Sequence, residues 1–204
     1  MVESKYCLHG GFNNMQEFTK QFFIDMPREQ FYLWIKEHYE MLIGSAIFTK
    51  SNKLGSRLVS FAQKIHDKQK SEFVPSHTAS IIEQNGMLYS FDMKPPRASI
   101  QSLTRYLLST NDDYILVLRN FPLDTFMFSK NVGYHVGEFY AYFSALRSVF
   151  TKRQTKWVTH CSELHARMIA LQGYQFPKDF DLECTPNELL MAFRNDMGDI
   201  INEL

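Results

Sequence analysis

The hydrophobic residues of the chain recur with two periods, one typical of helices and the other typical of strands. Between Met15 and Ile43 they follow the helical period, and Pro27 stands where a second helix would start, so we expect two short helices there. The helical period predicts further helices over residues 56–66, 99–109, 138–150, 161–172 and 187–195. Alternating or unbroken apolar runs predict strands over residues 42–49, 73–83, 88–93 and 114–119.

These elements do not repeat as strand, helix and strand, the order that builds a parallel sheet. Two of the strands instead flank Asn85-Gly86, a dipeptide typical of a two-residue hairpin loop. The order therefore predicts an α+β fold with a small, mostly antiparallel sheet. The chain has 204 residues, enough for one large domain and an appendage. We expect a helical appendage at residues 1–41, a candidate docking segment for a protein partner, and one main domain at residues 42–204.

The predicted hairpin brings a histidine and an aspartate to one face of the sheet. With a two-residue type I′ loop, Ala79 lies opposite Asp92. Two residues further from the loop, His77 lies opposite Lys94. Because residues two apart on a strand share a face, His77 and Asp92 become diagonal neighbours with Cβ atoms about 7–8 Å apart. A register shifted by one residue would put them on opposite faces. The alternative interpretation is that His77 is a surface histidine at a strand end and Asp92 a solvated strand residue.

Cys161 falls in the first turn of a predicted helix, for which Thr159 is a candidate N-cap. The thiol begins an apolar stripe at helical spacing, which continues through Leu164, Met168 and Leu171. The positive end of the helix dipole favours the thiolate, which is the nucleophilic form of cysteine. A small buried core thiol is the alternative interpretation of Cys161.

A metal site is the third interpretation, since His160 precedes Cys161 and His165 follows it by one helical turn. No carboxylate or second thiol stands at ligand spacing, so we predict neither a metal ion nor a cofactor. The three cysteines form no CxxC pair and no disulfide framework. We assign no role to Cys7 or Cys184.

The composition excludes several classes of partner. Lys plus Arg and Asp plus Glu number 22 each, so the net charge is zero and we expect no nucleic-acid partner. No stretch approaches 18 apolar residues, which predicts no transmembrane segment. The amino terminus lacks the apolar run of a signal peptide, and together with the few cysteines this predicts a cytoplasmic location.

Four short motifs stand in a definite order along the chain. They are Ser76-His77-Thr78-Ala79-Ser80-Ile81, Ser90-Phe91-Asp92, Cys161-Ser162-Glu163-Leu164 and Thr185-Pro186. This order resembles the circularly permuted branch of the NlpC-type papain-like cysteine hydrolases, which includes the YiiX-like proteins and lecithin retinol acyltransferase. The resemblance covers residues 42–193 and implies a permuted papain-like fold. The chain departs from the branch at Gly44-Ser45, where Gly-Asp is usual, and in the glycine of the histidine motif.

The resemblance implies a site in which Cys161 is the nucleophile, His77 the base and Asp92 the acid that orients the base. It implies a hydrolase or acyltransferase that forms a thioester with a peptide, isopeptide or acyl-ester substrate. The backbone N–H of Cys161 would supply part of an oxyanion hole. The alternative is a papain-like scaffold that binds a partner without catalysis, and the reactivity of Cys161 distinguishes the two.

Overall fold

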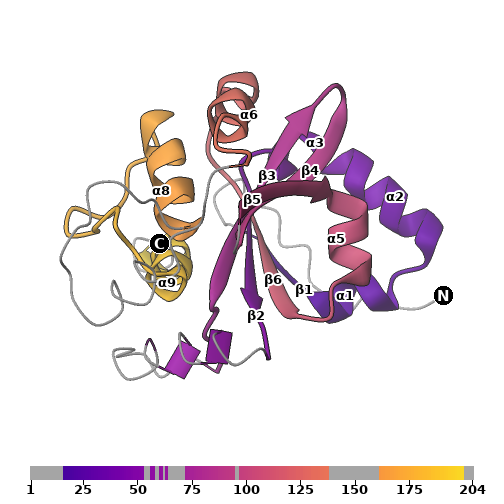
Figure 1. The fold of residues 1–204 in the computed structure, drawn as a ribbon, viewed down its shortest axis with the longest axis horizontal. Helices are drawn as coiled ribbons and strands as arrows, with labels where there is room; N and C mark the ends of the chain where they lie inside the picture. The colour runs from indigo at the N-terminus through magenta and orange to yellow at the C-terminus, as the bar shows by residue number, and fades with distance from the viewer. Residues whose placement is uncertain are drawn as a thin grey trace.

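The computed structural model describes residues 16–52, 56–57, 60–61, 63, 72–94, 97–137 and 161–199. Within these residues the chain is an α+β protein with one open, six-stranded sheet, in which all neighbouring strands are antiparallel. The strands lie in the order β1-β6-β2-β3-β4-β5 (Figure 1). Their bounds are β1 Gln16–Thr19, β2 Ala46–Lys50, β3 His77–Gln84, β4 Met87–Lys94, β5 Arg97–Ser102 and β6 Asp113–Leu118. The predicted α+β class and antiparallel sheet are confirmed.

Helices cover both faces of the sheet, as Figure 1 shows. The described helices are α1 Lys20–Asp25, α2 Arg28–Glu37, α3 Tyr39–Leu42, α5 Leu103–Ser109, α6 Thr125–Gly133, α8 Cys161–Leu171 and α9 Pro186–Asp199. Helix α5 covers one face, where Tyr114 of β6 donates a 2.8 Å hydrogen bond to the carbonyl of Leu107. Helices α8 and α9 cover the other face, where the rings of Phe48 and Phe193 lie 6.1 Å apart.

The amino-terminal segment differs from the two helices that its period predicts. Strand β1 precedes them and pairs with β6 at the edge of the sheet. Phe18 of β1 packs edge-on against Trp34 of α2, with ring centroids 4.9 Å apart. Arg194 of α9 donates two hydrogen bonds, of 2.7 and 2.9 Å, to the carboxylate of Glu17. Residues 16–42 therefore share the sheet and the core with the rest of the chain.

Of two other predicted helices, one is partly wrong and the other lies outside the described residues. The predicted helix at 99–109 is wrong in its first part, because β5 continues to Ser102 and α5 begins at Leu103. Strand β5 is an edge strand with mostly exposed side chains, and its apolar alternation consists of Ala98 and Ile100 alone, which is too short to mark a strand in the sequence. The predicted helix at 138–150 lies outside the described residues.

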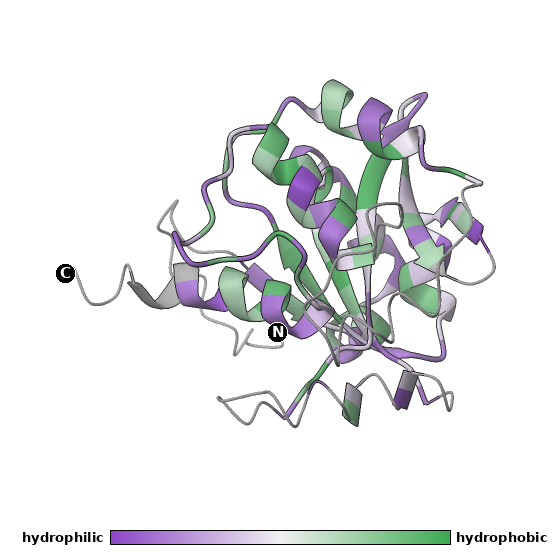
Figure 2. Ribbon diagram, turned by 60° about the vertical axis from the view of Figure 1, so that its left-hand side comes forward, coloured by the Kyte–Doolittle hydropathy of each residue, from purple (hydrophilic) through white to green (hydrophobic). Residues whose placement is uncertain are grey.

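The core lies on both faces of the central strands, and several segments in the middle of the molecule are coloured as hydrophobic in Figure 2. Every residue from Ala46 to Thr49 is buried, as expected for a strand with helices on both sides. The largest fully buried side chains come from the strands and from helices on both faces. They include Phe23, Phe31, Phe48, Phe91, Tyr114 and Phe128.

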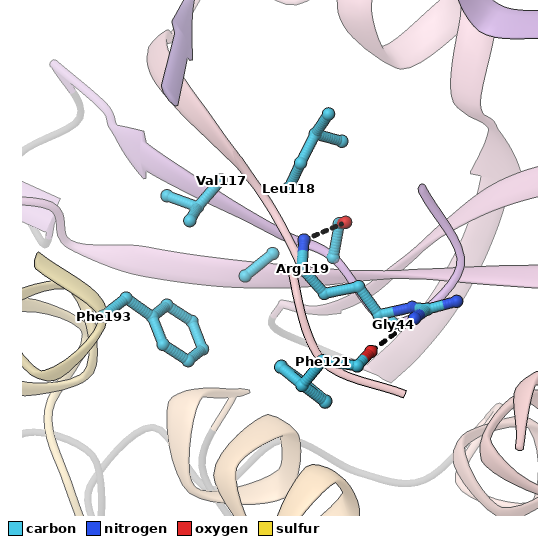
Figure 3. Close-up of a pocket in the computed structure, with 8 residues that line it drawn as sticks. Gly44, Val117, Leu118, Arg119, Phe121 and Phe193 are labelled. Atoms are coloured by element: carbon cyan, nitrogen blue, oxygen red, sulfur yellow. Dashed lines mark hydrogen bonds between the residues drawn. The ribbon is translucent and has the colours of Figure 1, made fainter. Parts of the chain in front are cut away.

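The start of β2 is held by Arg119, which follows β6. Its guanidinium donates 2.6 Å hydrogen bonds to three backbone carbonyls, those of Glu40, Ile43 and Phe121. Gly44 has a φ of +84°, which favours glycine, and a Cβ there would lie 2.3 Å from the terminal methyl carbon of Leu123, so that side chain would have to move. The hollow beside Gly44 in Figure 3 has an empty volume of about 160 Å³ that includes open solvent, and it has no room for a water-sized molecule.

Candidate active site

The β3–β4 hairpin has the loop and the register that the sequence predicts. Asn85 and Gly86 both have positive φ, 53° and 76°, as the central residues of a type I′ turn require. Pairing runs outward from the turn until Ala79 lies opposite Asp92. The prediction that places Ala79 opposite Asp92 is therefore confirmed.

The predicted pairing of His77 with Lys94 is wrong, because the β3–β4 ladder ends at Asp92. Beyond that point β4 continues to pair with β5 only, as far as Lys94 and Arg97. The two strands separate where β3 begins. The hairpin thus opens at the end that carries His77.

This opening gives the backbone N–H of Thr78 a different partner. Ile81 donates its N–H to Ser45 on the β2 side, at 3.0 Å, so alternation along β3 directs the N–H of Thr78 to the β4 side. With no ladder partner there, the backbone of Thr78 hydrogen-bonds the Cys161 thiol. The amino end of α8 therefore meets the sheet where β3 and β4 part.

His77 is hydrogen-bonded to the side chains of both Asp92 and Cys161. Its Nε2 is hydrogen-bonded to Oδ1 of Asp92, which leaves Nδ1 for the thiol of Cys161. All three residues are buried, with exposed fractions of 7% for His77, 8% for Asp92 and 6% for Cys161. The structure thus brings together the three residues that the sequence singled out.

The electrostatics of this cluster favour an ion pair. Burial by itself lowers the pKa of His77, but the charges of Cys161 and Asp92 and the hydrogen bonds to both raise it to about 9. Burial raises the pKa of Cys161, yet the charge and hydrogen bond of His77 and the backbone of Thr78 bring it below its usual value. Both shifts act in the same direction and favour thiolate beside imidazolium, with Asp92 compensating the imidazolium charge.

Two polar residues that sequence reasoning missed lie beside this cluster. Thr49 of β2 pairs with His77, so both side chains point to the face that α5 covers. Tyr106 of α5 is buried on that face, and its phenol lies beside the Thr49 hydroxyl. Burial and then the charge of Asp92 raise the pKa of Tyr106 well above its usual value, so the phenol remains protonated. The β2–β3 register would have identified Thr49, but no pattern within α5 distinguishes Tyr106.

Helix α8 is anchored around its first turn. Ser162 donates a 2.6 Å hydrogen bond to the carbonyl of Cys184, just before α9. Glu163 forms a 2.7 Å ion pair with Arg167, which also lies 3.6 Å from Glu183. The predicted cap at Thr159 and the neighbouring His160 lie outside the described residues. These contacts hold the chain segment before α9 against the helix that begins with Cys161.

The metal interpretation of Cys161 gains no support from the position of His165. The imidazole Nδ1 of His165 lies 2.8 Å from the Ser80 hydroxyl. Within the described ranges, no three His, Cys, Asp or Glu side chains are grouped so that they could hold a metal ion. Cys184 is a buried free thiol whose pKa burial raises well above its usual value, so it is not activated.

Comparison of the chain with models of known protein families and with curated proteins finds no match. Among the helices that the structure describes, none is both long and apolar enough to cross a membrane. The functional interpretation therefore depends on the geometry and electrostatics of the site.

Proposed function

We propose that the protein is a cysteine hydrolase or acyltransferase that acts on an amide or ester bond. Cys161 is the nucleophile, His77 the general base and acid, and Asp92 the residue that orients His77. The observation that carries the proposal is a single buried imidazole, His77, which is hydrogen-bonded to both a carboxylate and a thiol.

In the proposed reaction, the Cys161 thiolate attacks the carbonyl carbon of the substrate and forms a tetrahedral oxyanion. The His77 imidazolium then gives its proton to the leaving amine or alcohol, and a thioester on Cys161 results. Water, or an acceptor in the transferase case, attacks the thioester while His77 takes up its proton. Asp92 keeps the Nε2 proton of His77 in place, so that Nδ1 exchanges the catalytic proton. The backbone N–H of Cys161, at the start of α8, is the candidate donor to the oxyanion.

The finer assignment to a permuted papain-like fold is part of this proposal. An antiparallel sheet, a histidine strand that precedes the cysteine, and a helix that begins at Cys161 and packs on β3 all support it. The chain departs from the branch at Gly44-Ser45, directly before β2 begins. Ser45 lies four residues, about 13 Å along the strand, before Thr49. There Ser45 accepts a hydrogen bond from the backbone of Arg119, which is a structural task away from the cluster. The substrate classes of that branch, peptide, isopeptide and acyl ester, are the ones to test.

The pH dependence of cysteine alkylation tests the proposal. A small alkylating reagent is added to the wild type and to His77→Ala, and mass spectrometry follows each cysteine separately. At about pH 6 we expect Cys161 to react much faster than Cys184, and we expect His77→Ala to abolish this difference. Cys184 serves as the control in the same molecule, because its raised pKa keeps it a thiol.

A turnover assay with ester and amide substrates completes the test. Cys161→Ala removes the nucleophile and is expected to abolish turnover, whereas Cys184→Ala is expected to retain it. Equal reactivity of Cys161 and Cys184 in both proteins would contradict the proposal, and so would full turnover by Cys161→Ala. Either result would favour a papain-like module that binds a partner without catalysis.

A further inference from the structure

A second polar contact joins the helix of the nucleophile to the strand of the base. Ser80 of β3 and His165 of α8 share a 2.8 Å hydrogen bond, although they are 85 residues apart in the sequence. Both side chains are buried, and His165 is completely enclosed, with an exposed fraction of 0%. The elements joined by this bond are those that carry Cys161 and His77.

The two contacts between α8 and β3 are separated by similar distances along the helix and along the strand. From Cys161 to His165 the helix rises about 6 Å. From Thr78, which contacts Cys161, to Ser80, which contacts His165, the strand advances about 6.6 Å. Because these lengths match, the two contacts together fix both the position of α8 along β3 and its rotation about its own axis. A helix held at one point only could turn or slide.

The surroundings of His165 argue against a packing role alone. Its ring lies edge-on to Phe128 and Phe193, with centroids 6.0 and 6.2 Å away. Burial lowers the pKa of His165 to about 3, so the ring is neutral. Its Nε2 has no hydrogen-bond partner among the described residues, which makes histidine more costly here than an apolar side chain of similar size. The site retains a polar group whose one satisfied contact is the bond to Ser80.

We propose that Ser80 and His165 are a positioning pair, which holds α8 in the register that places the Cys161 thiol against His77. This inference rests on the proposed function and adds two residues that act on the nucleophile from a distance. The hydrogen bond acts through the helix, since His165 lies one helical turn after Cys161 and Ser80 lies two residues after Thr78, whose backbone bonds the thiol.

Four variants separate positioning from general stability. Ser80→Ala and His165→Leu remove the bond, whereas His165→Asn keeps a hydrogen-bonding atom near the place of Nδ1. Ser129→Ala is the matched control, because Ser129 is a buried serine of α6 that accepts a 3.0 Å hydrogen bond from the backbone of Glu83, at the other end of β3. Each variant is first checked for a cooperative melting transition, and the alkylation rate of Cys161 is then measured against pH.

We expect Ser80→Ala and His165→Leu to shift the pH profile of Cys161 alkylation upward by about one unit, which slows the reaction about tenfold at pH values below the pKa of the wild-type thiol. A fifth variant that combines Ser80→Ala with His165→Leu is expected to lose no more than either single variant, because both substitutions remove the same bond. His165→Asn should recover most of the rate. Ser129→Ala should lower the melting temperature and leave the pH profile of Cys161 unchanged.

Two results would overturn the positioning role. One is a wild-type pH profile of Cys161 in folded Ser80→Ala and His165→Leu, and the other is a loss in Ser129→Ala as large as that in Ser80→Ala. An unchanged profile in these two variants would leave the proposed function intact, because the same experiment measures the pKa of Cys161 in the wild type. An ordinary thiol profile in the wild type itself would instead overturn the proposed function and the positioning role with it.

Discussion

Replacing Cys161 and Asp92, singly and together, tests why the His77 imidazole is protonated near neutral pH. The pKa of His77 is about 9, against 6.5 for an unperturbed histidine. The difference, 9 − 6.5 = 2.5, corresponds to about 3 kcal/mol in favour of the imidazolium. The two acidic neighbours supply this and also overcome the opposing effect of burial. We therefore expect Cys161→Ala and Asp92→Asn each to give an intermediate pKa, and the double variant to give a pKa below 6.5, since only burial then remains.

NMR of the histidine ring nitrogens against pH measures this pKa directly. His165 provides a reference in every spectrum, because its burial keeps it neutral throughout the range in which His77 titrates. The double variant must retain the melting transition of a folded protein, which shows that His77 is still buried. A His77 that titrates near 6.5 in the wild type, and keeps that value when Cys161 is replaced, would refute the ion pair.

The raised pKa also fixes the sign of the pH dependence of stability. A group whose pKa is higher in the folded state contributes its full stabilisation below its unfolded pKa, here 6.5, and loses it as the pH rises through about 9. Asp92→Asn removes part of this contribution. Its destabilisation relative to the wild type, measured by urea unfolding, is therefore expected to be larger at pH values below 6.5 than above about 9.

Two further predictions concern the start of β2, away from the cluster. Gly44→Ala is expected to cost about 2–3 kcal/mol of unfolding free energy, because it combines a φ of +84° with a contact of 2.3 Å to Leu123. Gly86→Ala, with a φ of +76° and open space around it, should cost about 1 kcal/mol in the same urea titration, and equal losses would contradict a steric role for Leu123. Arg119→Lys is expected to lower the free energy of unfolding by about 2 kcal/mol, since one ammonium group cannot reach the three carbonyls that the guanidinium binds. An unchanged melting temperature would contradict this prediction.

The parts of the fold that the sequence predicted are those with strong local signals. Asn85-Gly86 requires two positive φ angles, so the turn fixes the register that sets Ala79 against Asp92. The apolar stripe that begins at Cys161 predicted α8 to within one residue at its end. In both cases residues close in the sequence determine the structure.

The parts that the sequence did not predict depend on contacts between distant residues. Strand β1 has only four residues and exists through its pairing with β6. The point at which the β3–β4 ladder ends has no local signal, since a regular hairpin would have continued to His77. The metal interpretation of Cys161 could also be judged only from the fold, because His165 follows it at ligand spacing but bonds Ser80 instead. Within the sequence, only the resemblance of motifs to a known family linked Cys161 to His77.

The two faces of strand β3 carry different parts of the candidate site. His77 and Asp92 lie on the face that α5 covers, whereas Ser80 lies on the face that α8 covers. In a fully paired sheet, the backbone of β3 and β4 would separate an imidazole on one face from a thiol that approaches from the other. Because the ladder stops at Asp92, Cys161 reaches the free N–H of Thr78 at the opening and meets the imidazole there. Extending the pairing by two residues would close this opening and part the thiol from the imidazole with every site residue still present, so the place where the ladder ends is itself a requirement of the site.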